Sequence, residues 1–117
     1  MAMLAGNDSM TDAEFESLAD RTLAALERAL DAAALDADVL AKGVGLLELE
    51  FADGSKMVIN RHTAAREIWV AAKSGGFHFR HADDGWRDTR DGGELFAALS
   101  RLVSAQGGTP VTLAPGG

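Results

Sequence analysis

Apolar residues recur at helical spacing between Thr11 and Ala34, and this is the first strong pattern in the chain. The apolar positions are Phe15, Leu18, Ala19, Leu23, Leu26, Ala29, Leu30 and Ala33. At 3.6 residues per turn they form one stripe, which is typical of a helix that packs on a core. Thr11 and Glu14 have capping-box spacing, in which each side chain accepts from a free amide at the helix start. The pattern predicts a helix over residues 12–34.

After this helix the period changes to two, because Leu47, Leu49 and Phe51 alternate with Glu48 and Glu50. Such alternation is typical of a strand with one buried face. Comparable runs predict strands over 47–51, 56–60, 67–73, 77–81 and 86–89, and a short strand over 39–42 would make six. The turns are predicted at 52–55, 74–76 and 83–85, and the Asp-Gly pairs in the first and last favour tight hairpins.

A second helical stripe follows, with Leu95, Leu99 and Leu102 on one face and Asp91 as its expected N-cap. The order of helix, antiparallel strands and helix predicts the α+β class. We expect a two-layer sandwich in which a sheet of five to six strands is covered on one face by the N- and C-terminal helices. Residues 1–10 are expected to form a flexible leader, and residues 11–117 a single domain with a Gly/Pro-rich tail from about 107.

Composition narrows what this domain can do. The chain has 117 residues, 47% of them hydrophobic, which suits one folded domain. It has no cysteine, so disulfides, cysteine nucleophiles and thiolate-held zinc or iron–sulfur clusters are excluded. No apolar run approaches the ~20 residues of a membrane span, and residues 1–9 lack the parts of a signal peptide. We expect a cytoplasmic protein that does not bind membranes.

The charge is acidic and unevenly distributed along the chain. The formal net charge of −7 argues against a nucleic-acid partner, which requires a basic surface. Residues 1–53 hold 12 Asp and Glu against 3 Lys and Arg, whereas residues 54–117 hold 6 against 8. This asymmetry suits a cation or a basic protein as the partner of the first half.

Four carboxylates of the predicted first helix lie on one flank of its apolar stripe. With ~100° per residue and Phe15 at zero, Glu16, Glu27, Asp20 and Asp31 fall at about 100°, 120°, 140° and 160°. The arginines of the same helix fall on the opposite flank, so they are not placed to neutralise these carboxylates. Like charges at i,i+4 cost about 0.2–0.5 kcal/mol per pair, which is typical of a position where function competes with stability.

Carboxylates are hard oxygen donors, which suit Ca²⁺, Mg²⁺, Mn²⁺ and iron rather than softer metals. An exposed row lacks the convergent geometry of a tight cage, so metal binding is expected to be weak and easily reversed. The alternative is that the acidic flank is only a solvated surface, as charged helix faces commonly are.

Several segments resemble one family. Residues 51–61 (FADGSKMVINR) resemble the frataxin signature, in which a strand, an Asp-Gly-Ser turn and a second strand are followed by Ile-Asn and a basic residue. Glu67–Ala71 resembles the central tryptophan strand of that family, and Gly75–Phe79 and Gly85–Trp86 resemble its next two strands. Met10–Asp20 is similar to the start of bacterial frataxins, and the order of all these segments is preserved.

The resemblance implies a role in iron–sulfur cluster assembly, with Fe²⁺ or Fe³⁺ held weakly along the first helix and the edge of the first strand. It also implies a cysteine desulfurase as partner. Carried over by position, the metal ligands would be Asp12, Glu14, Glu16, Asp20, Glu27, Asp31, Asp36 and Asp38, with Glu48 and Glu50 as secondary candidates. We call the first eight the acidic ridge. Bacterial frataxins often crowd acidic residues where this chain has Ala32–Leu35, so the expected iron capacity is lower and protein docking gains weight.

Trp69 is the main candidate on the sheet. If Ile68 and Val70 face the helices, Trp69 and Ala71 face outward. An exposed tryptophan is a good interface anchor, and the family assigns the matching tryptophan, together with the Asn60–Arg61 region, to partner contact. The alternative is that Trp69 packs over its neighbours for stability alone.

The remaining aromatic and imidazole side chains carry weaker signals. Trp86 is expected to be structural. His78 and His81 are three apart on one strand, so they point to opposite faces and do not share an ion. The chain shows no Ser/His/Asp constellation and no phosphate-binding loop, so we expect no enzymatic activity.

The leading hypothesis is therefore an iron-binding accessory protein of iron–sulfur cluster assembly, which docks to the cysteine desulfurase through its acidic ridge. The outer sheet face with Trp69 would meet a second partner, such as the cluster scaffold protein. The alternative is a protein-interaction regulator of the desulfurase for which iron binding is incidental. We expect a monomer.

Overall fold

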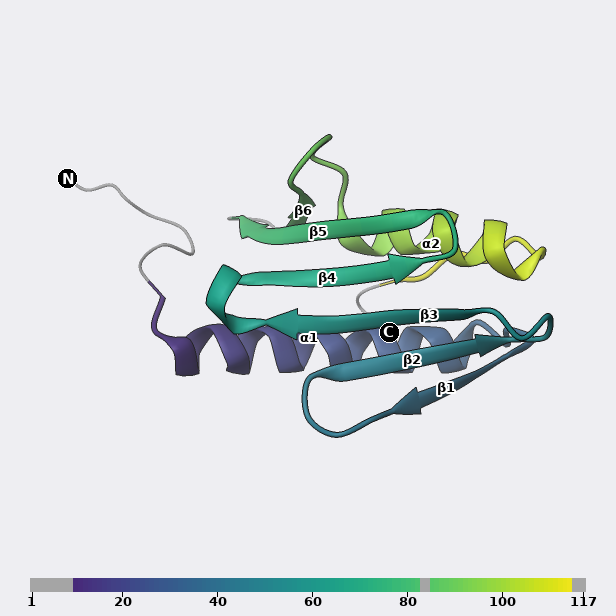
Figure 1. Cartoon of the computed structure of the whole chain (residues 1–117), viewed down its shortest axis with the longest axis horizontal. Coiled ribbons are helices and arrows are strands. Elements are labelled where there is room, and N and C mark those ends of the chain that lie inside the picture. The colour runs from purple at the N-terminus through teal and green to yellow at the C-terminus, as the bar shows by residue number, and fades with distance from the viewer. Residues whose placement is uncertain (1–9, 83–84, 115–117) are drawn as a thin grey trace.

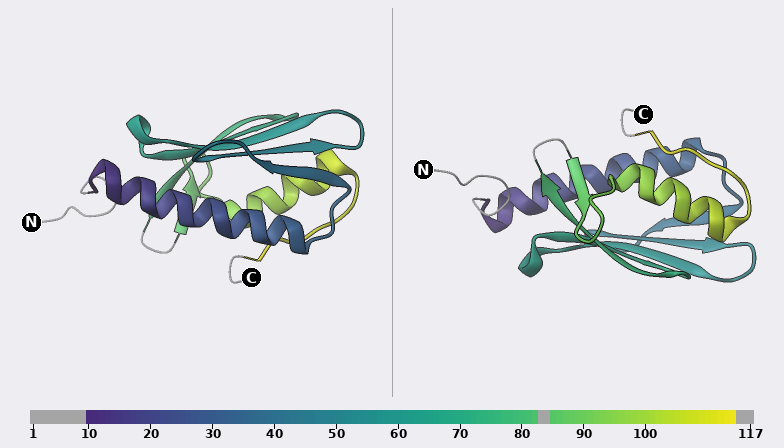
Figure 2. Two further views of the ribbon diagram at one scale, coloured as in Figure 1. Left: turned by 90° about the horizontal axis from the view of Figure 1, so that it is seen from below. Right: turned by 90° about the horizontal axis from the view of Figure 1, so that it is seen from above.

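The computed structural model describes residues 10–82 and 85–114 and arranges them in two layers. The elements are α1 (Asp12–Ala32), β1 (Ala37–Ala41), β2 (Leu46–Phe51), β3 (Lys56–His62), η2 (Thr63–Ala65), β4 (Glu67–Ala72), β5 (Gly75–Ala82), β6 (Gly85–Asp88) and α2 (Leu95–Gly107). The strands pair antiparallel in the order β1-β2-β3-β4-β5-β6 (Figure 1). Both helices lie on one side of this sheet (Figure 2). The predicted α+β two-layer sandwich is confirmed, with six strands.

The core forms between the inner face of the sheet and the apolar stripes of the helices. Register places Leu47 opposite Ile59, and Ile59 opposite Val70, so an apolar row crosses neighbouring strands. From the helices, Phe15 and Leu99 are fully buried against this face. Burial of alternate strand residues leaves the other face of the sheet without a covering layer. That outer face and the flanks of α1 are the surfaces on which a site can lie.

The first helix begins as predicted and ends earlier. Thr11 and Glu14 form the capping box, with the Thr11 amide donating to Glu14 Oε1 at 2.8 Å and the Glu14 amide to Thr11 Oγ1 at 3.1 Å. The helix stops at Ala32 rather than at the predicted Ala34. Ala34 adopts a φ of 55°, and this left-handed conformation turns the chain toward β1.

Two predicted boundaries on the C-terminal side are wrong. The turn predicted at 74–76 does not include Gly75 and Gly76, because these two residues begin β5 and pair with β4. Asp91 is not the N-cap of α2. Its Oδ1 instead accepts from the Gly93 amide at 2.8 Å, and the Glu94 carboxylate caps the helix by accepting from the amides of its first turn. An acidic group at this end also suits the helix dipole.

The β2–β3 turn is held by Asp53. The Ser55 hydroxyl and backbone amide both donate to Asp53 Oδ1, at 2.6 and 2.9 Å, and these hydrogen bonds lower the pKa of Asp53 from its ordinary value of 3.8. The folded state thus favours the carboxylate. Its stabilisation is present at pH values above the unfolded-state pKa and is lost as the pH falls through the folded-state pKa.

The segment after α2 packs back onto the domain. The Val111 amide donates to Ser104 Oγ and the Leu113 amide to Ser100 Oγ, both at 2.9 Å, and Leu113 is buried. The Gly/Pro-rich tail is therefore joined to the core as far as Leu113. The predicted leader lies outside the described residues except for Met10, as do Asp83 and Asp84 of the predicted 83–85 turn. Within the described residues, no helix has the length and apolar character needed to cross a membrane.

Candidate functional site

Arg61 extends from the inner face of β3 to α1 and lies between two carboxylates of the acidic ridge. Its Nη1 is 3.5 Å from Glu16 Oε1 and its Nε is 3.4 Å from Asp20 Oδ1. The Arg61 side chain is only 16% exposed, so the charge is held largely beneath the surface. Thr63 Oγ1 also donates to Glu16 Oε2 at 2.9 Å. Glu16 and Asp20 are therefore paired with groups from a distant part of the chain.

Arg66 makes a similar connection at the start of α1. Its Nη1 is 2.6 Å from Asp12 Oδ1, and its guanidinium donates to the Met10 carbonyl at 3.1 Å. It also lies 5.9 Å from the centre of the Phe15 ring. Arg66 has a φ of 57°, which is a strained backbone conformation for any residue other than glycine. The contacts of its side chain offset the free-energy cost of this strain. Since Glu14 is held in the capping box, all four ridge carboxylates of the first half of α1 have partners.

The second half of the acidic ridge differs. Within the described part of the chain, the side chains of Glu27, Asp31, Asp36 and Asp38 have no hydrogen bond or ion pair. Asp36, Asp38 and Glu50 line a pocket of about 260 Å³ at the free edge of the sheet. Asp38 is the register partner of Glu50, and like charges directly opposite on two strands destabilise the pair. This end of the ridge therefore keeps an uncompensated negative charge.

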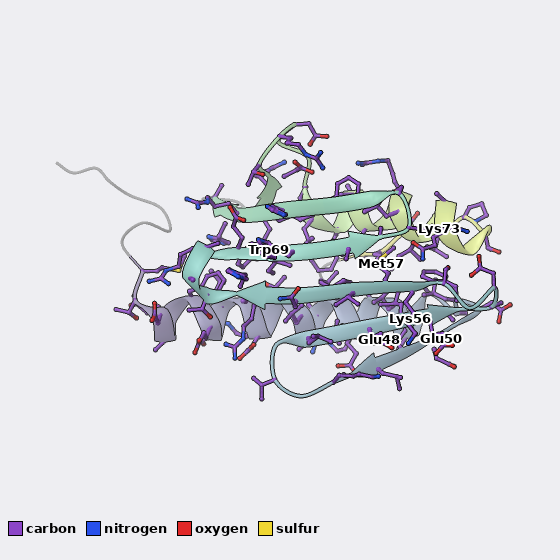
Figure 3. The ribbon with its side chains drawn as sticks, in the orientation of Figure 1. Glu48, Glu50, Lys56, Met57, Trp69 and Lys73 are labelled. Atoms are coloured by element: carbon purple, nitrogen blue, oxygen red, sulfur yellow. The ribbon has the colours of Figure 1, made fainter. Side chains whose placement is uncertain are left out.

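The two secondary candidates, Glu48 and Glu50, differ in exposure and in ion pairing. Glu48 is 13% exposed and lies 3.4 Å from Lys42 Nζ and 3.5 Å from Lys56 Nζ. Figure 3 shows Glu48, Glu50 and Lys56 at the β2–β3 side of the sheet. Only Glu50 is exposed and unpaired there among the described residues. In the described part of the chain, no three His, Asp or Glu side chains converge as a group that could hold a metal ion.

Gly45 makes room for Arg61 to reach the helix. A Cβ at this position would lie 2.4 Å from Arg61 Nε and 2.8 Å from its Cγ. The Gly45 carbonyl also accepts from the Arg61 backbone amide at 3.0 Å. The φ of Gly45 is 79°, which glycine adopts without a steric cost. The β1–β2 turn and the ion pairs of Glu16 and Asp20 therefore depend on one another.

Trp69 faces outward on β4, as predicted, but both faces of its ring are covered. The His62 ring stacks on one face at 3.8 Å between centroids and the His78 ring on the other at 4.7 Å. The indole Nε1 donates to Glu67 Oε1 at 2.8 Å. Figure 3 labels Trp69 on β4. Asn60 of β3 is its register partner and therefore lies on the same outer face. A partner would therefore meet the edge of the indole and the two imidazoles.

The remaining predictions about this part of the molecule are confirmed. Trp86 is buried and its Nε1 donates to Thr22 Oγ1 at 2.9 Å, so it is structural. His78 and His81 lie on opposite faces of β5, since His78 stacks on Trp69 and His81 contacts the edge of Trp86.

Sequence reasoning missed the cations that neutralise the first half of the ridge. It considered only partners within α1, whereas Arg61 and Arg66 come from β3 and the turn that follows it. Arg61 was predicted to be a partner-contact residue, and the structure places its charge against α1. A usable signal was present: Met57, Ile59 and Arg61 alternate, so Arg61 belongs to the inner row of β3.

A six-stranded antiparallel sheet under two helices, with an acidic row on the first helix and an open outer face, defines a class of small two-layer α+β sandwich proteins. Residues 8–109 match the family described as the frataxin-like domain. The chain belongs to the frataxin family.

Bacterial relatives cover most of the chain. It is 51% identical over 104 residues to the iron-sulfur cluster assembly protein CyaY of Dechloromonas aromatica, covering 89% of this chain and 99% of the relative. It is 50% identical over 107 residues to CyaY of Paraburkholderia phymatum, covering 91% and 100%. These relatives are named for assembly rather than for a catalysed reaction.

Solved structures agree with the fold. The frataxin of Psychromonas ingrahamii matches with a TM-score of 0.82 and 30% identity over 90% of this chain and 99% of that one. A trimeric yeast frataxin, described as complexed with ferrous iron, matches with a TM-score of 0.61 over 93% and 94% of the two chains. Its identity is 22%, so this second likeness supports the fold alone.

The close approach of Gly45 and Arg61 gives a prediction about stability. Gly45→Ala adds both a backbone cost and a clash with Arg61, whereas Gly43→Ala, in the same turn at a φ of 68° with open space around it, adds only the backbone cost. We expect Gly43→Ala to lower the free energy of unfolding by about 1 kcal/mol and Gly45→Ala by about 2–4 kcal/mol, measured by urea denaturation. Equal losses for the two variants would show that Arg61 is not held against Gly45.

Proposed function

We propose that this chain is an accessory protein of iron–sulfur cluster assembly, which binds Fe²⁺ or Fe³⁺ weakly as cargo and docks to the cysteine desulfurase. The names of its bacterial relatives support a role in assembly. The single observation that carries the rest of the proposal is the unpaired second half of the acidic ridge. Neighbouring carboxylates that no Lys or Arg side chain of the chain neutralises favour the binding of a metal ion or of a basic group on another molecule.

All eight ridge residues remain candidate ligands, but their availability differs. Iron at Glu16, Asp20 or Asp12 has to compete with Arg61 and Arg66, which already lie against these carboxylates. Glu27 and Asp31 on α1 lie outside this competition. We therefore assign the tighter share of the iron to the second half of the ridge, which also includes Asp36 and Asp38 and extends to Glu50.

The same charge supports docking. A basic surface on the desulfurase would approach the unpaired carboxylates, and such attraction acts mainly on the association rate and weakens as salt rises. A surface that both holds iron loosely and meets the desulfurase would bring the metal to the place where sulfur is released. Ala32–Leu35 carries no charge, so the density of carboxylates falls between α1 and β1. We therefore weigh protein docking nearly equally with iron binding as the function of the ridge.

A second candidate function is a regulator of the desulfurase for which iron binding is incidental. The pairing of the first half of the ridge by Arg61 and Arg66 favours this candidate, because those carboxylates then present a partly neutralised surface suited to contact with a protein. Modulation of the desulfurase with and without Fe²⁺ separates the two candidates.

We expect Fe²⁺ titration, followed by amide resonances in the NMR spectrum, to perturb the second half of the ridge first. Signals near Glu27, Asp31 and Asp38 should broaden at lower iron concentration than those near Glu16, because Arg61 competes for the latter. The diamagnetic control is Mg²⁺ at the same concentrations, which reports charge effects without paramagnetic broadening. If no amide of α1 or β1 responds, the ridge is not the iron site.

Charge reversal in the unpaired half distinguishes the two candidates. We expect Glu27→Lys with Asp31→Lys to weaken both Fe²⁺ binding and desulfurase binding by about tenfold or more, measured by calorimetry at low salt. The matched control is Arg21→Glu with Arg28→Glu, on the other flank of α1. If the reversed variant loses iron but still binds and modulates the desulfurase, these ridge carboxylates are not the docking surface, and regulation of the desulfurase through this ridge is excluded.

The outer sheet face is proposed as a second contact, for the cluster scaffold protein. Asn60 and Trp69 would carry this contact together with the imidazoles stacked on the indole. We expect Trp69→Ala to weaken scaffold binding by about tenfold and to leave desulfurase binding unchanged, whereas Val58→Ala, on the same face, changes neither. Unchanged scaffold binding in Trp69→Ala would indicate that the stack serves stability alone.

A further inference from the structure

Residues of the β1–β2 turn and of the middle of α1 line a common pocket. The pocket has a volume of about 160 Å³. An apolar cavity of about 150 Å³ accepts a guest the size of benzene, so this pocket has room for one side chain and not for a helix or a strand. The volume therefore suits a single projecting side chain.

The walls of the pocket combine apolar and acidic groups. Leu23 and Ala24 of α1 form one wall, and Val44 of the turn forms the opposite one. Asp20 and Glu27 also line the pocket, from the turns of α1 before and after Leu23. A guest with an apolar stem and a cationic end would match both kinds of surface.

Val44 is the second notable feature. Its side chain is 79% exposed, although a valine usually lies inside a protein. Leu40, at 44%, is the other large hydrophobic residue that is exposed in the described part of the chain, and it does not line the pocket. An isolated exposed apolar residue needs no explanation, but Val44 forms one wall of a pocket whose other wall bears carboxylates.

The fold itself already places one guanidinium beside this pocket. Arg61 passes Gly45, a pocket residue, and its Nε lies 3.4 Å from Asp20 Oδ1. Glu27 lines the same pocket two helical turns further on and, among the described residues, has no cationic partner. The space between α1 and the β1–β2 turn thus accommodates an arginine at one end and has an unpaired carboxylate at the other.

We propose that this pocket receives one arginine side chain of the protein that docks on the acidic ridge. The inference rests on the proposed docking function and specifies its contact. The apolar stem of the arginine would lie between Leu23 and Val44, and its guanidinium would reach Glu27 and the outer side of Asp20. Arginine fits better than lysine because its guanidinium is weakly hydrated, stays charged and pairs with carboxylates through a planar fork.

The first test uses the full chain and the purified cysteine desulfurase. We expect Val44→Ser to weaken the complex about tenfold, and Leu40→Ser, which removes a similar apolar group outside the pocket, to change it less than twofold. Iron broadening at Asp31 and Asp38 should be the same in Val44→Ser as in the unchanged chain, since no carboxylate is altered. Desulfurase binding by Val44→Ser equal to that of the unchanged chain overturns the proposal.

A double-mutant cycle tests whether one side chain makes both contacts. Val44→Ser and Glu27→Gln, combined, should weaken binding by clearly less than the product of the two single effects, because either change already loosens the same arginine. An exact product would mean two independent contacts and would overturn the single-arginine proposal. If the charge reversal at Glu27 and Asp31 leaves desulfurase binding intact, the proposed docking function is wrong. A titration with an arginine compound then tests, independently of the desulfurase, whether the pocket binds arginine.

That measurement uses N-acetyl-arginine amide as the probe and amide resonances as the readout. We expect shifts confined to residues 20–27 and 43–47 of the unchanged chain, and at least threefold smaller shifts with N-acetyl-lysine amide at the same concentration. In Val44→Ser the shifts caused by arginine amide should fall to the level of those caused by the lysine compound. Absence of shifts, or equal shifts with both compounds, would overturn the assignment of the pocket to arginine.

Discussion

The structure depends on burying one face, and only one, of a six-stranded antiparallel sheet. Alternation makes every second strand residue part of the core, and α1 and α2 together cover that face (Figure 2). Leu49, Ile59 and Val70 are consequently almost without contact with solvent. The intervening residues have no second layer to cover them, and the helices expose the flanks beside their apolar stripes. The two candidate surfaces follow from this arrangement: the flank of α1 that continues to the β1 edge, and the outer face around Trp69.

Arg61 marks where the apolar interior meets the acidic flank. It follows Met57 and Ile59 in the inner row of β3, but it lies beyond the apolar stripe of α1 and so meets Glu16 and Asp20. Because the Arg61 side chain is only 16% exposed, solvent screens its attraction to the two carboxylates less than it screens a fully exposed pair. The acidic ridge consequently has two parts with different surroundings. The first half joins the helix to the sheet, whereas the carboxylates of the second half are unpaired among the described residues.

Local patterns predicted most of the fold, and long-range contacts account for what they missed. The period-two run at Leu47–Phe51 and the capping box at Thr11 depend on neighbours in sequence, and both were found. The end of α1 was misplaced because Ala34 is left-handed without being glycine. The cap of α2 was misplaced because Asp91 and Glu94 are both acceptable cap residues, and only the path of the chain selects between them. The pairing of the ridge lay beyond helix periodicity, since it requires knowing that β3 crosses beneath α1.

The position of β1 at the edge of the sheet has a consequence for contacts between copies of this chain. An edge strand offers unpaired amides and carbonyls to any other strand, including β1 of a second copy. Asp36 and Asp38 lie along this edge, and two copies brought together there would oppose four carboxylates at close range. The carboxylates that we propose attract a cation or a basic protein would therefore also discourage strand addition between identical chains.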